Sequence, residues 1–286
     1  MAVTPFHALA CPLDGLPLAD YGNHWRCPNG HTFDVAREGY LHLLPVQHKR
    51  SRDPGDSKEM VAARRRFLAA GAYQPIAVAI AEAVLGNAAD AATDAASTLH
   101  CLDAGCGEGH YLRELIAAAE GRQALSIVGL DISKWAVQAA AKRDRQSTWI
   151  VGSNARLPLL AGTLDRVLCL FGFPVYPEFA RVLCPGGLLV QADAGADHLS
   201  ELRQIIYPTL KPAPNATFLA PPGFSLIDER DVRYHTEIVG AANIADLLAM
   251  TPHLFRASHE GKQRLAAFDT LPIHVDVRLR ILRRQD

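Results

Sequence analysis

The segment from Leu99 to Gly109 constrains the fold of this chain more than any other, because it joins a short apolar strand to a glycine-rich turn. The turn has glycine at every second position, Gly105, Gly107 and Gly109, and a second apolar run ends at Asp131. In a parallel sheet such a turn lets backbone N–H groups approach a ligand, and an acidic residue ending the next strand can bind a ribose diol. The pair predicts a nucleoside-binding site on an α/β fold.

The glycine spacing separates two classes of nucleoside cofactor. The dinucleotide fingerprint G-x-G-x-x-G, counted from Gly105, requires its third glycine at the position of His110. The spacing therefore disfavours a nicotinamide dinucleotide. Two structural alternatives remain open: a strand-to-helix turn for the glycines, and a helix N-cap for Asp131.

Apolar runs and helical patterns alternate from residue 99 onward. We expect strands at 99–103, 126–131, 149–152, 165–170 and 188–192, and helices at 110–119, 133–142 and 178–183. This alternation predicts a doubly wound, mostly parallel sheet. The run 273–282 alternates with period two, which predicts a strand with one polar face.

The N-terminal third has a different character. Ser57 is a plausible N-cap for a helix carrying Met60, Ala63, Phe67 and Leu68, and Pro75 suits the start of a second helix. Residues 11–35 are rich in turn formers, and a segment this small needs a cross-link, here called a staple, to hold its fold. We therefore divide the chain into a small module at 1–36, a basic linker with helices at 37–98, and an α/β domain at 99–286.

The staple predicted for the small module is a metal. Its ligands would be Cys11, Asp14, Cys27 and His31. Zn²⁺ prefers four tetrahedral ligands on two short turns, but a carboxylate stands at position 14, where a second thiolate is expected. His24 is an alternative fourth ligand. The other reading is a module without zinc, held together by the packing of Leu13, Leu16, Trp25 and Phe33.

The chain has 29 Lys and Arg residues against 30 Asp and Glu, so its net charge is close to zero. Its overall charge therefore cannot attract nucleic acid, and any such attraction must come from a local basic patch. A local basic run exists between residues 37 and 66, comprising Arg37, Lys49, Arg50, Arg52, Lys58, Arg64, Arg65 and Arg66. It is either a nucleic-acid surface or a solvated helix face and loop.

The six cysteines form no disulfide pattern, and no apolar run has the length of a membrane span. We therefore expect a cytoplasmic protein without a membrane partner.

Five segments together resemble one family. They are Cys11 to His31, residues 31–40 (HTFDVAREGY), 43–56 (LLPVQHKRSRDPGD), 103–109 (DAGCGEG) and the tripeptide Met250-Thr251-Pro252. The chain resembles the bacterial 23S rRNA (guanine-N1)-methyltransferases, which are class I enzymes dependent on S-adenosylmethionine. The resemblance implies a seven-stranded Rossmann-like sheet ending in an antiparallel strand, with a small N-terminal zinc-knuckle-like module that helps to recognise RNA.

The same resemblance implies a homodimer that forms a cleft for a 23S rRNA hairpin. Residues 45–56 are more similar to the Gram-negative branch than to the branch tied to tylosin resistance, which implies guanosine 745 rather than 748. A methyltransferase for small molecules, and an RNA-binding protein that keeps the fold without catalysis, are the alternative functions.

The resemblance also assigns candidate residues. Those for the cofactor are Asp103, Gly105, Gly107, Gly109, Asp131 and Asn154; those for RNA are His48, Lys49, Arg50 and Arg52. Phe171 and Phe173 leave the fourth strand, where parallel sheets place the substrate, and either ring can stack on a base. The proton acceptor is unknown, with Asp193, Phe173 and Thr251 as candidates for the catalytic site.

Overall fold

A mixed sheet forms the centre of the molecule. The computed structural model describes residues 3–48, 51, 53–86, 97–209 and 218–286. In this part of the chain the sheet has nine strands in the order β11-β12-β10-β9-β6-β7-β8-β5, with β1 pairing β7 outside this path. The strands from β6 onward are β6 (Leu99–Ala104), β7 (Leu125–Asp131), β8 (Thr148–Val151), β9 (Leu164–Leu170), β10 (Leu183–Ala194), β11 (Phe224–Val239) and β12 (Thr270–Arg284).

The predicted strands are all present. β6, β7, β8, β9 and β10 run parallel, and β12 lies antiparallel between β10 and β11. β7 is buried along its whole length except for Asp131, as expected where helices cover both faces of a parallel sheet. The seven strands β6 to β12 thus form the predicted class I methyltransferase sheet.

The helices of this sheet also follow the sequence pattern. They are α1 (Lys58–Ala69), α2 (Gln74–Leu85), α3 (His110–Ala119), α4 (Lys134–Arg143) and α5 (Tyr176–Val182). The side chain of Ser57 accepts a hydrogen bond from the Met60 backbone N–H and caps α1, and Pro75 lies in the first turn of α2. Of the expected core residues of α1, Ala63, Phe67 and Leu68 are buried, whereas Met60 is half-buried.

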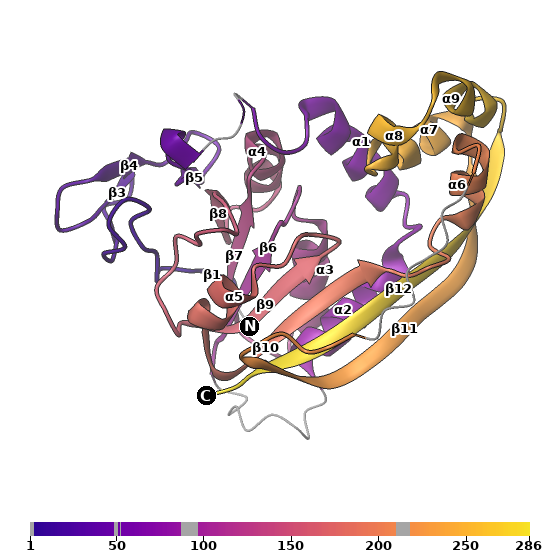
Figure 1. Cartoon of the computed structure of the whole chain (residues 1–286). Coiled ribbons are helices and arrows are strands. Elements are labelled where there is room, and N and C mark those ends of the chain that lie inside the picture. The colour runs from indigo at the N-terminus through magenta and orange to yellow at the C-terminus, as the bar shows by residue number, and fades with distance from the viewer. Residues whose placement is uncertain (1–2, 49–50, 52, 87–96, 210–217) are drawn as a thin grey trace.

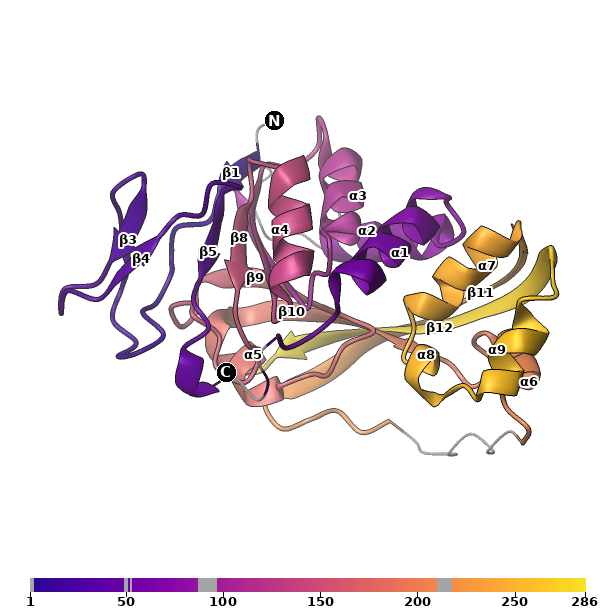
Figure 2. The same cartoon turned by 90° about the horizontal axis from the view of Figure 1, so that it is seen from above.

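A helical lobe at one end of β11 and β12 was not predicted. It contains α6 (Ser200–Ile206), α7 (Ala241–Ala249), α8 (His253–Arg256) and α9 (His259–Leu265). Figures 1 and 2 show these helices gathered beside α1. Arg66 on α1 donates two hydrogen bonds to Asp246 on α7, at 2.7 and 2.5 Å, and so fastens the lobe to the rest of the domain.

The N-terminal segment builds a second, smaller sheet and also extends the large one. β2 (Ala19–Asp20), β3 (His24–Arg26) and β4 (Thr32–Asp34) form the small antiparallel sheet. β1 (Val3–Pro5) pairs with β7, and β5 (Tyr40–His42) pairs with β8, before a short 3-10 helix, η1 (Val46–His48). The division at 36/37 and 98/99 stays a prediction. No single helix in the described ranges is long and apolar enough to cross a membrane.

Candidate functional site

The glycine turn between β6 and α3 is tied to the end of β7. The backbone N–H groups of Gly105 and Cys106 both donate to the Leu130 carbonyl, at 2.8 and 3.0 Å. Gly105, Gly107 and Gly109 have φ values of +107°, +55° and +79°. Residues other than glycine rarely adopt this left-handed region of the backbone.

The three glycines face different surroundings. A Cβ on Gly105 would have no described atom within 4 Å, so this side of the turn is open. A Cβ on Gly107 would lie 3.6 Å from Nη1 of Arg64, and a Cβ on Gly109 would lie 2.6 Å from the ring of Trp149. Gly105 therefore leaves room for a ligand, whereas Gly109 is required by the packing of the turn against the buried Trp149.

Asp131 links the glycine turn to the turn that follows β7. Its Oδ2 accepts a hydrogen bond from the Gly107 N–H at 2.9 Å, and its Oδ1 accepts one from the Ser133 N–H at 2.7 Å. The N-cap alternative for Asp131 is wrong, because Ser133 is the residue that caps α4. Burial raises the pKa of Asp131, while these two N–H groups and the charge of Arg64 lower it. Each carboxylate oxygen has two acceptor positions, so the side chain keeps capacity for ribose hydroxyls.

Three buried polar atoms beside the turn have no hydrogen-bond partner among the described residues. They are Oδ1 of Asp103, Oδ1 of Asn154 and Nε2 of His110. Asp103 is 1% exposed, and burial, together with the negative charge of Asp131, raises its pKa to about 8. A buried polar atom without a partner costs about 1–3 kcal/mol. A ligand with a cationic group near Asp103 and a hydrogen-bond donor near Asn154 would remove this cost, which fits S-adenosylmethionine.

An aromatic group continues the site beyond β9. Phe171 has a φ of +54°, which is strained for a side chain of this size and is typical of functional sites. Its ring lies 6.3 Å from Tyr73, 6.5 Å from Tyr111 and 6.1 Å from His198. The Tyr73 hydroxyl and His198 Nε2 are hydrogen-bonded at 3.0 Å. Sequence reasoning missed Tyr73, Tyr111 and His198, because they come from three separate places: the N-cap of α2, the helix α3 and the loop after β10.

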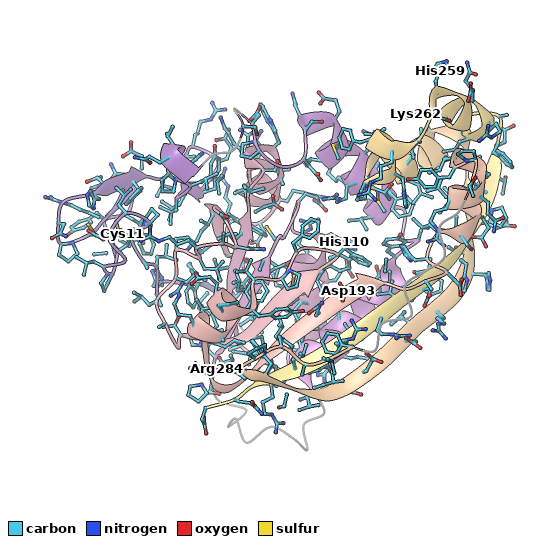
Figure 3. The ribbon with its side chains drawn as sticks, viewed as in Figure 1. Cys11, His110, Asp193, His259, Lys262 and Arg284 are labelled. Carbon is cyan, nitrogen blue, oxygen red and sulfur yellow. The ribbon has the colours of Figure 1, made fainter. Side chains whose placement is uncertain are left out.

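Two of the three candidates for catalysis, Asp193 and Thr251, are held in structural contacts, whereas the third, Phe173, is exposed. Asp193 Oδ2 accepts hydrogen bonds from Gln191 at 2.7 Å and from Arg280 at 3.1 Å. Thr251 is buried and donates its hydroxyl to the Leu248 carbonyl at 3.0 Å, which ends α7. Phe173 is 91% exposed. Figure 3 shows Asp193 and His110 near the centre of the molecule.

The predicted metal ligands lie together in the N-terminal module, where Figure 3 labels Cys11. The ligand atoms of Cys11, Asp14, Cys27 and His31 are all within 4.8 Å of one another. His31 Nδ1 lies 3.5 Å from Cys11 Sγ, 3.3 Å from Cys27 Sγ and 3.1 Å from Asp14 Oδ2. Ligands bound at 2.0–2.3 Å to a tetrahedral zinc lie roughly 3.3–3.8 Å apart. The donor set and its spacing therefore fit a structural zinc.

The alternatives for the module fare differently. His24 is outside the cluster: its ring stacks on Tyr21 and its Nδ1 bonds to Asn23. Trp25 is buried against a core that Leu16 and Phe33 also contact, but Leu13 is 46% exposed and does not support the module as expected.

Comparison with known proteins places the chain in a family. Residues 9–52 match the zinc-ribbon family model described as "RlmA, N-terminal", and residues 101–187 match a methyltransferase domain. A Bacillus subtilis (strain 168) protein, provisionally named 23S rRNA (guanine-N1)-methyltransferase YxjB, is 31% identical over 95% of both chains. A Micromonospora griseorubida protein provisionally named 23S rRNA (guanine-N1)-methyltransferase is 37% identical over 68% of both chains. The chain belongs to the 23S rRNA (guanine-N1)-methyltransferase family.

A third relative of this methyltransferase carries a more specific name. The 23S rRNA (guanine(748)-N1)-methyltransferase of Streptomyces fradiae is 38% identical over 68% of this chain and 66% of its own length. The family and domain matches establish an enzyme that depends on S-adenosylmethionine and carries an N-terminal zinc ribbon. The recognition of the family from sequence is therefore confirmed.

Part of the predicted RNA-binding set of this methyltransferase lies outside the described residues. Lys49, Arg50 and Arg52 are among those left out, as is the side chain of His48. In the described part of the basic run, Arg64 pairs with Asp56 at 2.7 Å and Arg66 pairs with Asp246. The RNA-binding assignment stays a prediction.

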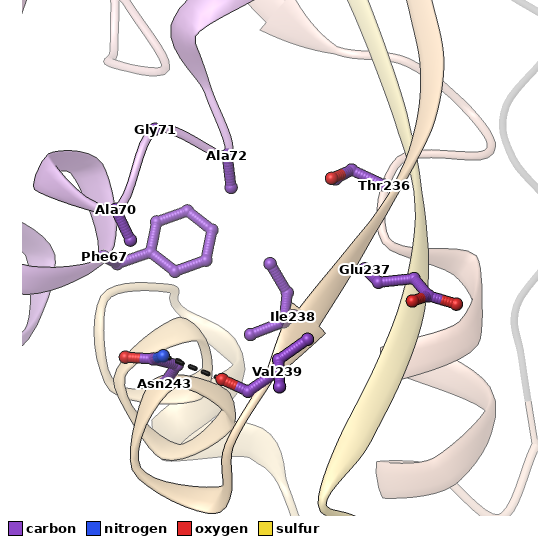
Figure 4. A pocket seen from close by; sticks show the side chains of 9 residues that line it. All are labelled: Phe67, Ala70, Gly71, Ala72, Thr236, Glu237, Ile238, Val239 and Asn243. Atoms are coloured by element: carbon purple, nitrogen blue, oxygen red, sulfur yellow. Dashed lines mark hydrogen bonds between the residues drawn. The ribbon is translucent and has the colours of Figure 1, made fainter.

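A pocket of about 320 Å³ in the methyltransferase lies away from the cofactor residues. Figure 4 shows it between the C-terminal end of α1, at Phe67 and Ala70, and the end of β11, at Ile238 and Val239. Asn243 closes one side by donating its side-chain amide to the Val239 carbonyl at 2.8 Å. None of the predicted cofactor residues lines this pocket.

Proposed function

We propose that this protein transfers a methyl group from S-adenosylmethionine to N1 of a guanosine in 23S rRNA. The observation that carries the cofactor half is the buried, unpartnered Asp103 oxygen beside an open glycine turn. The RNA half is supported by the relative that matches along 95% of both chains.

The cofactor residues divide the ligand between them. Asp131 would accept the ribose hydroxyls, and Asp103 would meet the ammonium group of the methionine part. Asn154 donates its amide N–H to the Ala104 carbonyl at 3.2 Å, so its Oδ1 is oriented to accept a hydrogen bond from the adenine amino group. S-Adenosylmethionine, when bound, supplies an activated methyl group on its sulfonium. The protein's main task is therefore to position the two reactants.

The acceptor atom sets a second requirement. N1 of guanine carries a proton and lies inside a Watson–Crick pair, so the base must be unpaired and the proton must leave as the methyl group arrives. Flat aromatic surfaces hold unpaired bases by stacking. The Phe171 ring, 40% exposed and backed by Tyr73, Tyr111 and His198, is such a surface at the mouth of the sheet.

The finer assignments of the sequence remain part of this proposal. Residues 45–56 support guanosine 745 as the target, and the basic set His48, Lys49, Arg50 and Arg52 supports a contact with the rRNA hairpin. A homodimer would form the cleft for that hairpin. We place the reaction in the cytoplasm, because ribosomal RNA is its substrate.

Methyl transfer from labelled cofactor to unmodified 23S rRNA tests the proposal. We expect incorporation into the rRNA and none into a panel of small metabolites; incorporation into metabolites alone would establish the small-molecule alternative and overturn the proposal. Mass mapping of rRNA from cells that lack the protein then identifies the nucleotide, because that nucleotide lacks its methyl group. Loss of the methyl group at 745 is expected, and loss at 748 would contradict the assignment.

A further inference from the structure

Arg64 on α1 lies directly over the glycine turn. Its Nη1 is 3.6 Å from the position of a Cβ on Gly107, and it forms an ion pair with Asp56 at 2.7 Å. Its Nη2 donates to the Met250 carbonyl at 3.0 Å. The side chain is 31% exposed, so these contacts do not bury it completely.

The other cations at the turn are committed elsewhere. Arg113 and Arg143 pair with Glu108, whose side chain is 1% exposed, at 2.7 and 3.1 Å. Burial lowers the pKa of His110, which keeps this ring neutral at pH 7. Arg64 is paired as well, but its partner Asp56 is only half-buried, and Arg64 is the described side chain within 4 Å of the Cβ position of Gly107. An anion bound at Gly107 would therefore meet Arg64 before the other two arginines.

The proposed cofactor brings one anion to this place, the carboxylate of its methionine part. We propose that Arg64 binds this carboxylate, opposite Asp103, which takes the neighbouring ammonium group. A guanidinium has five N–H donors in a fork that matches a carboxylate, and Asp56 and Met250 use only part of that set. The inference rests on the cofactor half of the proposed function.

The glycine turn then has two side chains of opposite charge, Arg64 and Asp103, for the carboxylate and ammonium groups of the methionine part. Arg64 also contacts the linker at Asp56 and the turn after α7 at Met250, which are far apart in the sequence. These two contacts hold the guanidinium in place before the ligand arrives, so little side-chain entropy is lost on binding.

Calorimetric binding of two probes tests the assignment. S-Adenosylhomocysteine carries the carboxylate, whereas 5′-methylthioadenosine keeps the adenosine but lacks the amino-acid part. We expect Arg64→Gln to weaken S-adenosylhomocysteine binding roughly 10- to 100-fold, the range of a charged hydrogen bond, and to change 5′-methylthioadenosine binding less than about twofold. Arg64→Lys keeps the charge and should restore part of the affinity.

The matched control is Arg65→Gln, because Arg65 is the adjacent, exposed arginine of the same helix. It should bind both probes as the unaltered protein does. Equal loss of both probes in Arg64→Gln, or no loss of either, would overturn the carboxylate contact. If the unaltered protein binds neither probe, the cofactor half of the proposed function fails instead.

Discussion

The substitution Gly109→Ala tests why the third glycine of the turn is needed. The new Cβ would lie 2.6 Å from the tip of the buried Trp149 ring, and the backbone would keep a φ of +79°. A left-handed residue with a side chain costs about 1–2 kcal/mol, and overpacking a core costs about 1–3 kcal/mol more. We therefore expect the free energy of unfolding to fall by about 2–5 kcal/mol.

Gly121→Ala is the matched control, because Gly121 has a similar φ of +73° and no described atom within 4 Å of its Cβ position. Urea unfolding of both variants without cofactor separates the two contributions. The control should lose only the backbone cost, about 1–2 kcal/mol. Equal destabilisation of the two variants would refute the packing role assigned to Gly109.

Three further predictions concern the other parts of the site. Asp131→Asn should weaken S-adenosylhomocysteine binding at least tenfold without unfolding the protein, because a neutral amide accepts ribose hydroxyls less well; unchanged affinity in calorimetry would contradict the ribose contact. Protein purified without a tag should contain one zinc per chain by elemental analysis, and Cys27→Ser should lose it; a metal-free native protein with the same melting temperature would count against the site. The raised pKa of Asp103, about 8, means that the folded state binds more protons than the unfolded state above pH 4. The free energy of unfolding without cofactor should therefore fall as the pH rises from 5 to 8, as measured by urea titration. If Asp103→Asn shows the same dependence of this free energy on pH, Asp103 is excluded as the cause.

The elements around the cofactor site could be predicted because their signals are local. The helix expected at 110–119 is α3 with the same bounds, and Ser57 and Pro75 begin their helices as capping rules require. The clustering of Cys11, Asp14, Cys27 and His31 was also predicted, since Cys and His on short turns have a recognisable spacing.

β11 had no such signal. β11 is an exposed edge strand rich in charged residues, so it lacks the apolar alternation by which strands are recognised. Its pairing with β12 supplies the order that its own sequence does not indicate.

The glycine spacing and Asp131, taken alone, were enough to predict a nucleoside site on an α/β fold, because strand, turn and helix follow from neighbouring residues. Only the tertiary structure decided what surrounds that turn. Arg64 meets Met250 across 186 positions of sequence, and Trp149 fills the space that makes Gly109 necessary. Such contacts depend on how distant segments pack against each other, so the sequence pattern within either segment cannot predict them.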